Sequence, residues 1–107
     1  MSLNDYSDRV AVWLARNFPG DNLLWRGLVL AEEVGEVCRC IVKADSGQRG
    51  TRDEWMRELY IEVGDVFLSL QATCNLAGID LEKAVHDRFT AVEHMDLFAR
   101  RLPSEKP

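Results

Sequence analysis

Residues 28–41 read LVLAEEVGEVCRCI, and this stretch decides the fold class. Its apolar residues recur at intervals of three and four, which is the period of one face of an α-helix. This first stripe consists of Leu30, Val34, Val37 and Ile41. A second segment repeats the same period with Trp55, Leu59, Val63, Val66 and Leu70. The two stripes predict two long amphipathic helices, and no segment of the chain has the alternation of a strand.

Turn-forming residues divide the chain into four predicted helices. A proline and a glycine close the first helix at residues 18–20, a polar break at residues 46–50 closes the second, and Gly78 closes the third. Thr51 and Glu54 predict a capping box, and Asp80 predicts the cap of the fourth helix. The predicted helices cover residues 5–17, 22–44, 51–77 and 80–100, with a frayed tail at 103–107. We therefore expect one all-α domain over residues 1–107, similar to a four-helix bundle.

Composition excludes several classes of protein. The formal net charge is -5, which argues against a nucleic-acid binder that neutralises phosphates with a basic surface. No apolar run reaches membrane-spanning length, and the first residues lack the pattern of a signal peptide, so we expect a cytoplasmic protein without membrane partners. The cysteines lie inside helical patterns and predict buried reduced thiols.

Four carboxylates stand at matching positions on the second and third predicted helices. Glu33 and Glu36 lie to one side of the first stripe, and Glu62 and Asp65 lie at the same offsets from the second. Packing of two antiparallel helices through these stripes would gather the four acids at one edge. Their mutual repulsion calls for a cation, and oxygen ligands suit Mg²⁺ or Mn²⁺. From the pattern alone, a metal site and a solvent-exposed acidic face are equally good interpretations of these four residues.

Other residues allow both a functional and a structural interpretation. Arg88 falls within the apolar stripe of the fourth helix, where it could hold a phosphate or pair with a buried acid. Lys43 lies near the break after the second helix and could meet phosphate or simply be solvated. Trp25 could stack on a base, although core packing is the usual fate of tryptophan. Glu32 points away from the stripe, as a solvated acid or a proton acceptor.

The two acidic motifs resemble the signature of MazG-like nucleotide pyrophosphohydrolases. Residues 32–36 read EEVGE and residues 62–66 read EVGDV, and the resemblance extends over about residues 20–95. It implies a helical bundle assembled as a dimer or tetramer, which hydrolyses a nucleoside triphosphate to the monophosphate and pyrophosphate. Many relatives have a phosphate-binding lysine at the position of Arg88, and often asparagine where this chain has Val92. The metal ligands implied by the resemblance are Glu33, Glu36, Glu62 and Asp65.

We therefore expect a magnesium-dependent hydrolase of nucleoside or deoxynucleoside triphosphates that acts in nucleotide-pool housekeeping. Either Glu32 or Glu33 could be the general base. A phosphoribosyl-ATP pyrophosphohydrolase and a helical interaction module without catalysis are the alternatives. Homo-oligomerisation is expected from the apolar surface as well, because a small bundle cannot cover all the large aromatic residues: Trp13, Trp25, Trp55, Phe67 and Phe89.

Overall fold

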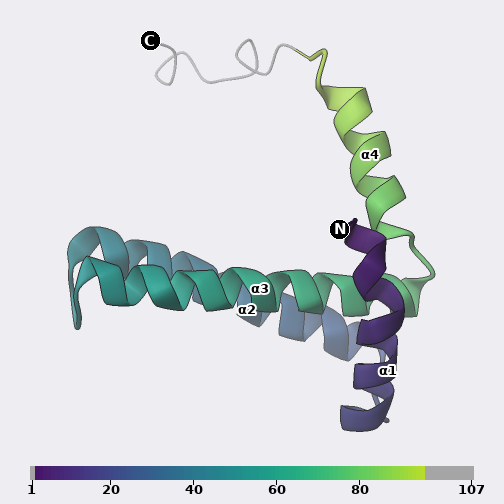
Figure 1. Cartoon of the computed structure of the whole chain (residues 1–107), viewed down its shortest axis with the longest axis horizontal. Coiled ribbons are helices and arrows are strands. Elements are labelled where there is room, and N and C mark those ends of the chain that lie inside the picture. Colours follow the sequence, from purple (N-terminus) through teal and green to yellow (C-terminus); the bar gives the residue numbers. More distant parts are fainter. Residues whose placement is uncertain (1, 96–107) are drawn as a thin grey trace.

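The structure is a computed structural model that describes residues 2–95, and these residues form helices joined by short turns (Figure 1). No strand occurs within residues 2–95, so the predicted all-α class is confirmed. The predicted tail at 103–107 lies outside the described residues. The elements are η1 (Leu3–Tyr6), α1 (Ser7–Asn17), α2 (Leu23–Ser46), α3 (Arg52–Ala77) and α4 (Leu81–Val92).

The helix ends follow the predicted caps with one difference. The Asp80 side chain accepts a hydrogen bond from the backbone N–H of Lys83 at 3.0 Å, and Gly78 ends α3 in the left-handed conformation at φ 70°. Thr51 Oγ1 accepts from the backbone N–H of Glu54 at 3.2 Å. The Glu54 carboxylate, however, accepts a hydrogen bond from the Thr51 hydroxyl and not from the Thr51 backbone N–H. Only half of the predicted capping box therefore forms.

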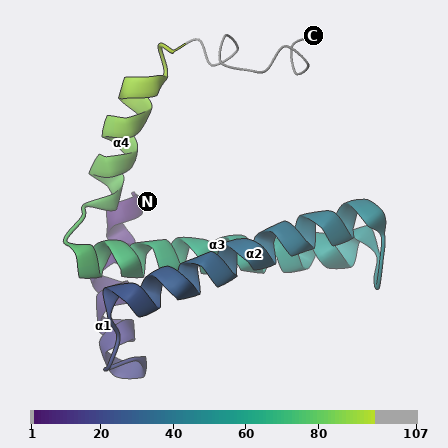
Figure 2. The same cartoon turned by 180° about the vertical axis from the view of Figure 1, so that it is seen from behind.

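The fourth helix is shorter than predicted. It ends at Val92, and residues 93–95 form a turn, whereas the sequence pattern extended it to about Arg100. Residues 96–100 lie outside the described part of the chain. The end of α4 carries β-branched Thr90 and Val92 and projects away from the other helices (Figures 1 and 2). A helix end without tertiary packing depends on intrinsic propensity, which β-branched residues lower.

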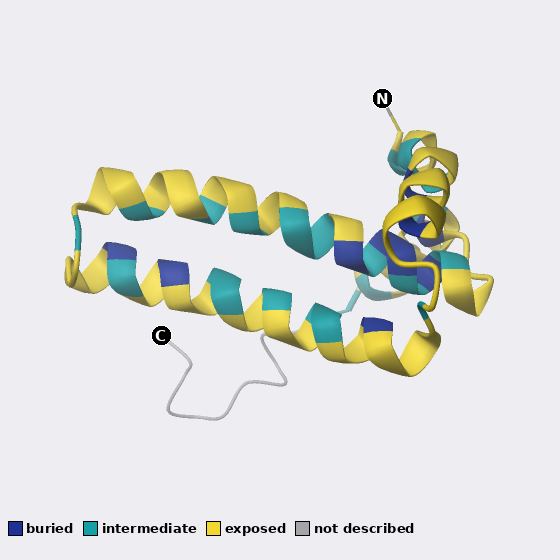
Figure 3. Cartoon of the chain, turned by 90° about the horizontal axis from the view of Figure 1, so that it is seen from below, coloured by how far each residue is buried: buried dark blue, intermediate teal, exposed yellow. Residues whose placement is uncertain are grey.

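The helices α2 and α3 form a long antiparallel pair, but the face along which they meet only partly matches the predicted one (Figure 3). Cys40 is 3% exposed, whereas its neighbour Ile41 from the predicted stripe is 51% exposed. Val34 and Val63 are also exposed, and Glu33 and Glu62 are half-buried between the helices. The prediction that the pair packs through the two apolar stripes was therefore only partly correct, because Leu30, Val37 and Leu59 are half-buried but Val34, Ile41 and Val63 are exposed. The predicted place of the acids, at one edge of the contact, was wrong. The acids lie within the contact, and part of each stripe faces outward.

The first helix crosses the second half of α3 and forms the apolar core there. Val10 and Leu14 of α1 pack against Ala72 of α3, and the rings of Tyr6 and Phe67 meet edge to face at 5.7 Å. Polar side chains tie the same two helices together. Asn75 donates to the backbone carbonyl of Ser7 at 3.1 Å and accepts from the Ser7 hydroxyl at 3.0 Å and from the Gln71 amide at 2.9 Å.

The last helix stands apart from the α2–α3 pair. Its contacts are mainly with η1, and Figures 1 and 2 show it pointing away from the pair. Leu81 at its start is buried, whereas Val85 and Phe89 further along are exposed. Within residues 2–95, no helix is both long enough and apolar enough to cross a membrane.

Candidate functional site

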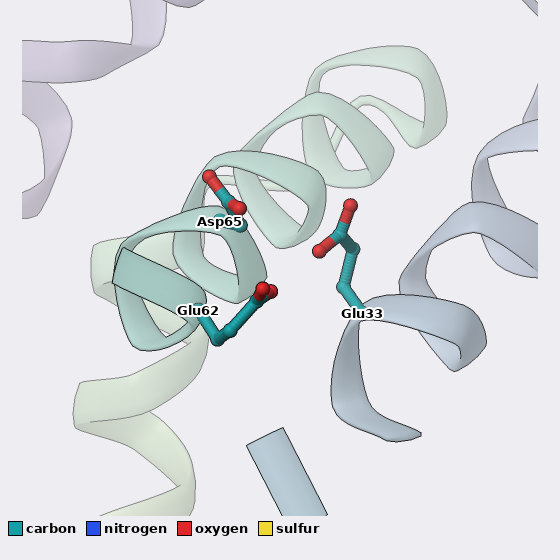
Figure 4. Close-up of side chains that lie close together, drawn as sticks. All are labelled: Glu33, Glu62 and Asp65. Atoms are coloured by element: carbon teal, nitrogen blue, oxygen red, sulfur yellow. The ribbon is translucent and has the colours of Figure 1, made fainter. Parts of the chain in front are cut away.

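Three of the predicted acids come together between the two long helices. Glu33 on α2 and Glu62 and Asp65 on α3 each place a carboxylate oxygen within 4.8 Å of the others (Figure 4). Glu62 and Asp65 are one turn apart on the same face of α3, and Glu33 reaches toward them from the opposite helix. This acidic cluster offers only oxygen ligands, the donor set that hard divalent cations such as Mg²⁺ and Mn²⁺ accept.

The acidic cluster is electrostatically crowded. Burial is the main cause of the raised pKa of both Glu33 and Glu62, and neighbouring carboxylates, Asp65 first among them, raise each pKa further. A raised pKa means that the ionised form of each carboxylate costs stability in the folded protein, first through lost hydration and then through repulsion by its neighbours. A bound cation would remove this cost, so the charge distribution fits a divalent metal ion.

The other two acids of the first motif are placed differently. Glu36, half-buried one turn after Glu33, is not among the three clustered residues and forms an exposed ion pair with Arg39 at 3.2 Å. Its charge still raises the pKa of Glu33 and Glu62, so it lies near the acidic cluster. Glu32 is exposed, in agreement with its predicted direction away from the helix contact.

A cavity of about 220 Å³ adjoins the acidic cluster and extends toward the end of α1. Glu33 and Asp65 form part of its wall, so the cavity and the cluster are continuous. Trp25, which the sequence suggested as a base-stacking residue, lines it and is half exposed. The remaining wall is made of Trp13, Phe18, Arg26, Val29, Leu68 and Ser69.

Sequence reasoning overlooked Arg26, which is the most buried charged residue of residues 2–95. Its Nε donates to the Asp21 carboxylate, and its guanidinium lies 4.9 Å from the centre of the Phe18 ring. Two helical turns separate Arg26 from Glu33, so both lie on the same face of α2. That spacing was a readable signal, because it puts an arginine on the face that packs against α3.

The two predicted cationic contacts lie outside this cavity. Arg88 is exposed on α4 and forms no ion pair with any residue between 2 and 95. About 18 Å of helix separates Asp65 from the end of α3, and α4 continues away from there. Lys43 is half-buried near the turn after α2 and donates to Gln48 at 3.1 Å. Within one chain, neither residue borders the cavity beside the acidic cluster.

Comparison with known proteins identifies the family. The model of the MazG nucleotide pyrophosphohydrolase domain matches residues 22–94, which include both acidic motifs and the whole of α2, α3 and α4. No curated protein and no solved structure gave a significant match. The match covers more than half of the chain and agrees with its all-helical fold and its acidic cluster. The chain therefore belongs to the MazG nucleotide pyrophosphohydrolase family.

Proposed function

We propose that this protein hydrolyses a nucleoside or deoxynucleoside triphosphate between the α and β phosphates, with Mg²⁺ as its natural metal, in nucleotide-pool housekeeping. The observation that carries the proposal is the continuity of two features. An acidic cluster suited to a divalent cation borders a cavity with aromatic walls, and Glu33 and Asp65 belong to both. A nucleoside triphosphate matches both features, because its phosphates bind a divalent cation and its base has flat apolar faces that fit aromatic walls.

Glu33, Glu62 and Asp65 are the proposed ligands, and Glu36 joins them when its exposed ion pair with Arg39 opens. A divalent cation bound there would neutralise the triphosphate and polarise its phosphorus. The carboxylates fix where the phosphates lie, and their burial keeps bulk water from screening the charges. Trp13 and Trp25, further along the cavity, orient the nucleoside by stacking.

The attacking water must lose a proton, and the first acidic motif supplies the acceptor. Glu32 and Glu33 remain the two candidates. Glu33 lies in the acidic cluster, beside the place where a metal-bound water would be. Glu32 is adjacent to Glu33, is exposed and is not one of the proposed metal ligands. The variant E32Q separates them. If Glu32 is the base, E32Q lowers kcat and leaves Mg²⁺ binding unchanged, whereas a normal kcat in E32Q assigns the base to Glu33.

A homo-oligomer, either a dimer or a tetramer, is part of the proposal. One open side of the α2–α3 pair carries an apolar groove with a volume of about 170 Å³, lined by Val34, Val37, Val63 and Val66. Met56, Tyr60 and Ile61 on α3 are exposed and line one further hollow, and contiguous apolar surface of this kind marks an interaction site. A second copy would cover it. A phosphate contact by Arg88 or Lys43 then requires a partner copy, because within one chain they lie outside the cavity.

A screen of triphosphates tests the function. Purified protein is incubated with Mg²⁺ and each common ribo- and deoxyribonucleoside triphosphate, with phosphoribosyl-ATP as a further substrate, and pyrophosphate release is measured. We expect release from at least one nucleoside triphosphate, its loss with a chelator, and its loss in E62Q. The matched control is E58Q, which removes a carboxylate one turn away from Glu62 that is not in the acidic cluster. Equal activity of E62Q and E58Q would refute the proposed site, and release from phosphoribosyl-ATP alone would replace the proposed substrate.

A further inference from the structure

We propose that Arg26 selects the base of the substrate, and that it favours guanine, thymine or uracil over adenine and cytosine. The inference rests on the proposed function, since it assigns one end of the same cavity. It starts from the burial of Arg26, whose side chain is only 6% exposed although it carries a full charge. A charged group at such a position needs partners for its donors.

The acidic partner of Arg26 does not line this cavity. Asp21 accepts from Nε, and its own side chain is 8% exposed. Asp21 lines two neighbouring cavities but not the one beside the acidic cluster, which Arg26 does line. Both Nη groups of Arg26 find no acceptor among residues 2–95, so this side of the guanidinium is available for a ligand. Phe18 holds the guanidinium plane by a cation–π contact at 4.9 Å.

The position of Arg26 favours contact with the base over contact with the phosphates. Two helical turns, about 10 Å along the axis, separate it from Glu33 in the acidic cluster. This spacing suits the far edge of a base whose phosphates lie at the cluster. Trp13, Phe18 and Trp25 surround this end of the cavity, and they match the flat faces of a base. The ion pair with Asp21 also neutralises the guanidinium, which reduces its attraction for phosphate.

A guanidinium can only donate hydrogen bonds, and this property decides the selectivity. Guanine presents a carbonyl oxygen and a ring nitrogen as acceptors on one edge, and thymine presents a carbonyl oxygen at the corresponding place. Adenine and cytosine carry amino groups there, which also donate. Uracil has the same carbonyl as thymine. On this edge cytosine offers the arginine no acceptor, and adenine offers only its ring nitrogen beside the amino group, whereas guanine accepts two hydrogen bonds. A buried arginine facing an amino group leaves a donor without an acceptor, so adenine and cytosine are disfavoured.

Binding of nucleoside monophosphates tests this inference separately from catalysis. Trp13 and Trp25 line the cavity, so quenching of tryptophan fluorescence reports occupancy. We expect dGMP and dTMP to bind the wild-type protein roughly tenfold or more tightly than dAMP and dCMP. R26K keeps the charge opposite Asp21 but lacks the planar fork, and it should reduce the difference to within about threefold. The matched control is R16K, because Arg16 is exposed on α1 and lies outside the cavity. It should leave the difference in affinity between the two groups of bases unchanged.

The double variant D21N/R26M removes both charges of the buried pair, so it keeps the test valid if a single change unfolds the protein. It should bind all four monophosphates with similar affinity. Equal affinities in the wild type, an equal loss for all four bases in R26K, or no saturable quenching at all would each overturn the assignment. The triphosphate screen is read independently. Selective binding without pyrophosphate release would refute the proposed function and leave the assignment of Arg26 standing.

Discussion

The α1–α3 contact and the middle of the α2–α3 pair are both packed helices, but they bury different chemistry. Between α1 and α3, Val10, Leu14 and Ala72 exclude water together, and Asn75 links the helices by hydrogen bonds. Between α2 and α3, the half-buried groups include three carboxylates that repel one another. The first contact stabilises the fold, whereas the second costs stability without a cation. This difference is the one expected if the second contact forms the proposed metal site.

The largest expected effect follows removal of one carboxylate from the acidic cluster. D65N should lower kcat/KM for triphosphate hydrolysis by roughly a thousandfold, because it removes a proposed metal ligand, and loss of even indirect metal contacts costs ten- to hundredfold. Without metal, the same variant should melt at a higher temperature than the wild type, because one repelling charge is gone. Activity and thermal unfolding are measured on the same sample. A D65N protein with near-normal magnesium-dependent activity would contradict the cluster.

The opposite behaviour is expected for a change in the apolar core. L14A should lower the free energy of unfolding by about 2–5 kcal/mol, because it leaves a cavity beside Val10 and Ala72. Denaturant unfolding measures this loss. The Mg²⁺ concentration that gives half-maximal activity should stay unchanged at a temperature where the variant is folded. A shift in that concentration would mean that the two regions are energetically coupled.

A smaller effect is expected at Arg88, which tests whether α4 takes part in the site at all. If a partner copy brings Arg88 to the phosphates, R88A should lower kcat/KM about ten- to a hundredfold, and R88K should recover part of the loss. The melting temperature should not change, because Arg88 is exposed. Normal kinetics in R88A would remove Arg88 from the site and leave the acidic cluster unaffected.

The pH dependence of stability distinguishes the two regions more finely. The pKa values of Glu33 and Glu62 are raised above the ordinary 4.5, so the folded protein holds protons that the unfolded chain releases. Stability of the metal-free protein should therefore fall as the pH rises from 4.5 through the raised pKa values. The slope should be smaller in E62Q and smaller again with Mg²⁺, measured by urea unfolding at several pH values. Identical slopes of stability against pH in the wild type and E62Q would mean that ionisation of Glu62 costs the folded protein no stability.

The sequence predicted the elements of the fold better than their relative rotation. The caps at Thr51 and Asp80 and the stop at Gly78 follow from local backbone chemistry, and the structure has all three. The face along which α2 packs on α3 does not follow from local chemistry. Exposed Val34 and Ile41 fit a helical period as well as buried Cys40 and Ala44 do. An apolar stripe shows that a surface will be covered, but it does not show whether the same chain covers it.

The candidate site was predicted in part for the same reason. Glu33, Glu62 and Asp65 stand out by their spacing, and the structure brings them together. Arg26 went unnoticed because its role depends on the loop at residues 18–21, which brings Phe18 and Asp21 back to the start of α2. The spacing from Glu33 could have marked the face on which Arg26 lies, but the return of the loop has no periodic pattern, so the partners of Arg26 are visible only in three dimensions.

Binding of Mn²⁺ tests the central claim most directly, because Mn²⁺ occupies magnesium sites and its free concentration can be followed by electron paramagnetic resonance. The wild-type protein should take up Mn²⁺ at a saturable, stoichiometric site. E62Q should lose that site, whereas E58Q, with its carboxylate removed one turn away, should keep it. Absence of saturable binding in the wild type, or equal binding by E62Q and E58Q, would show that the carboxylates between α2 and α3 do not form a metal site.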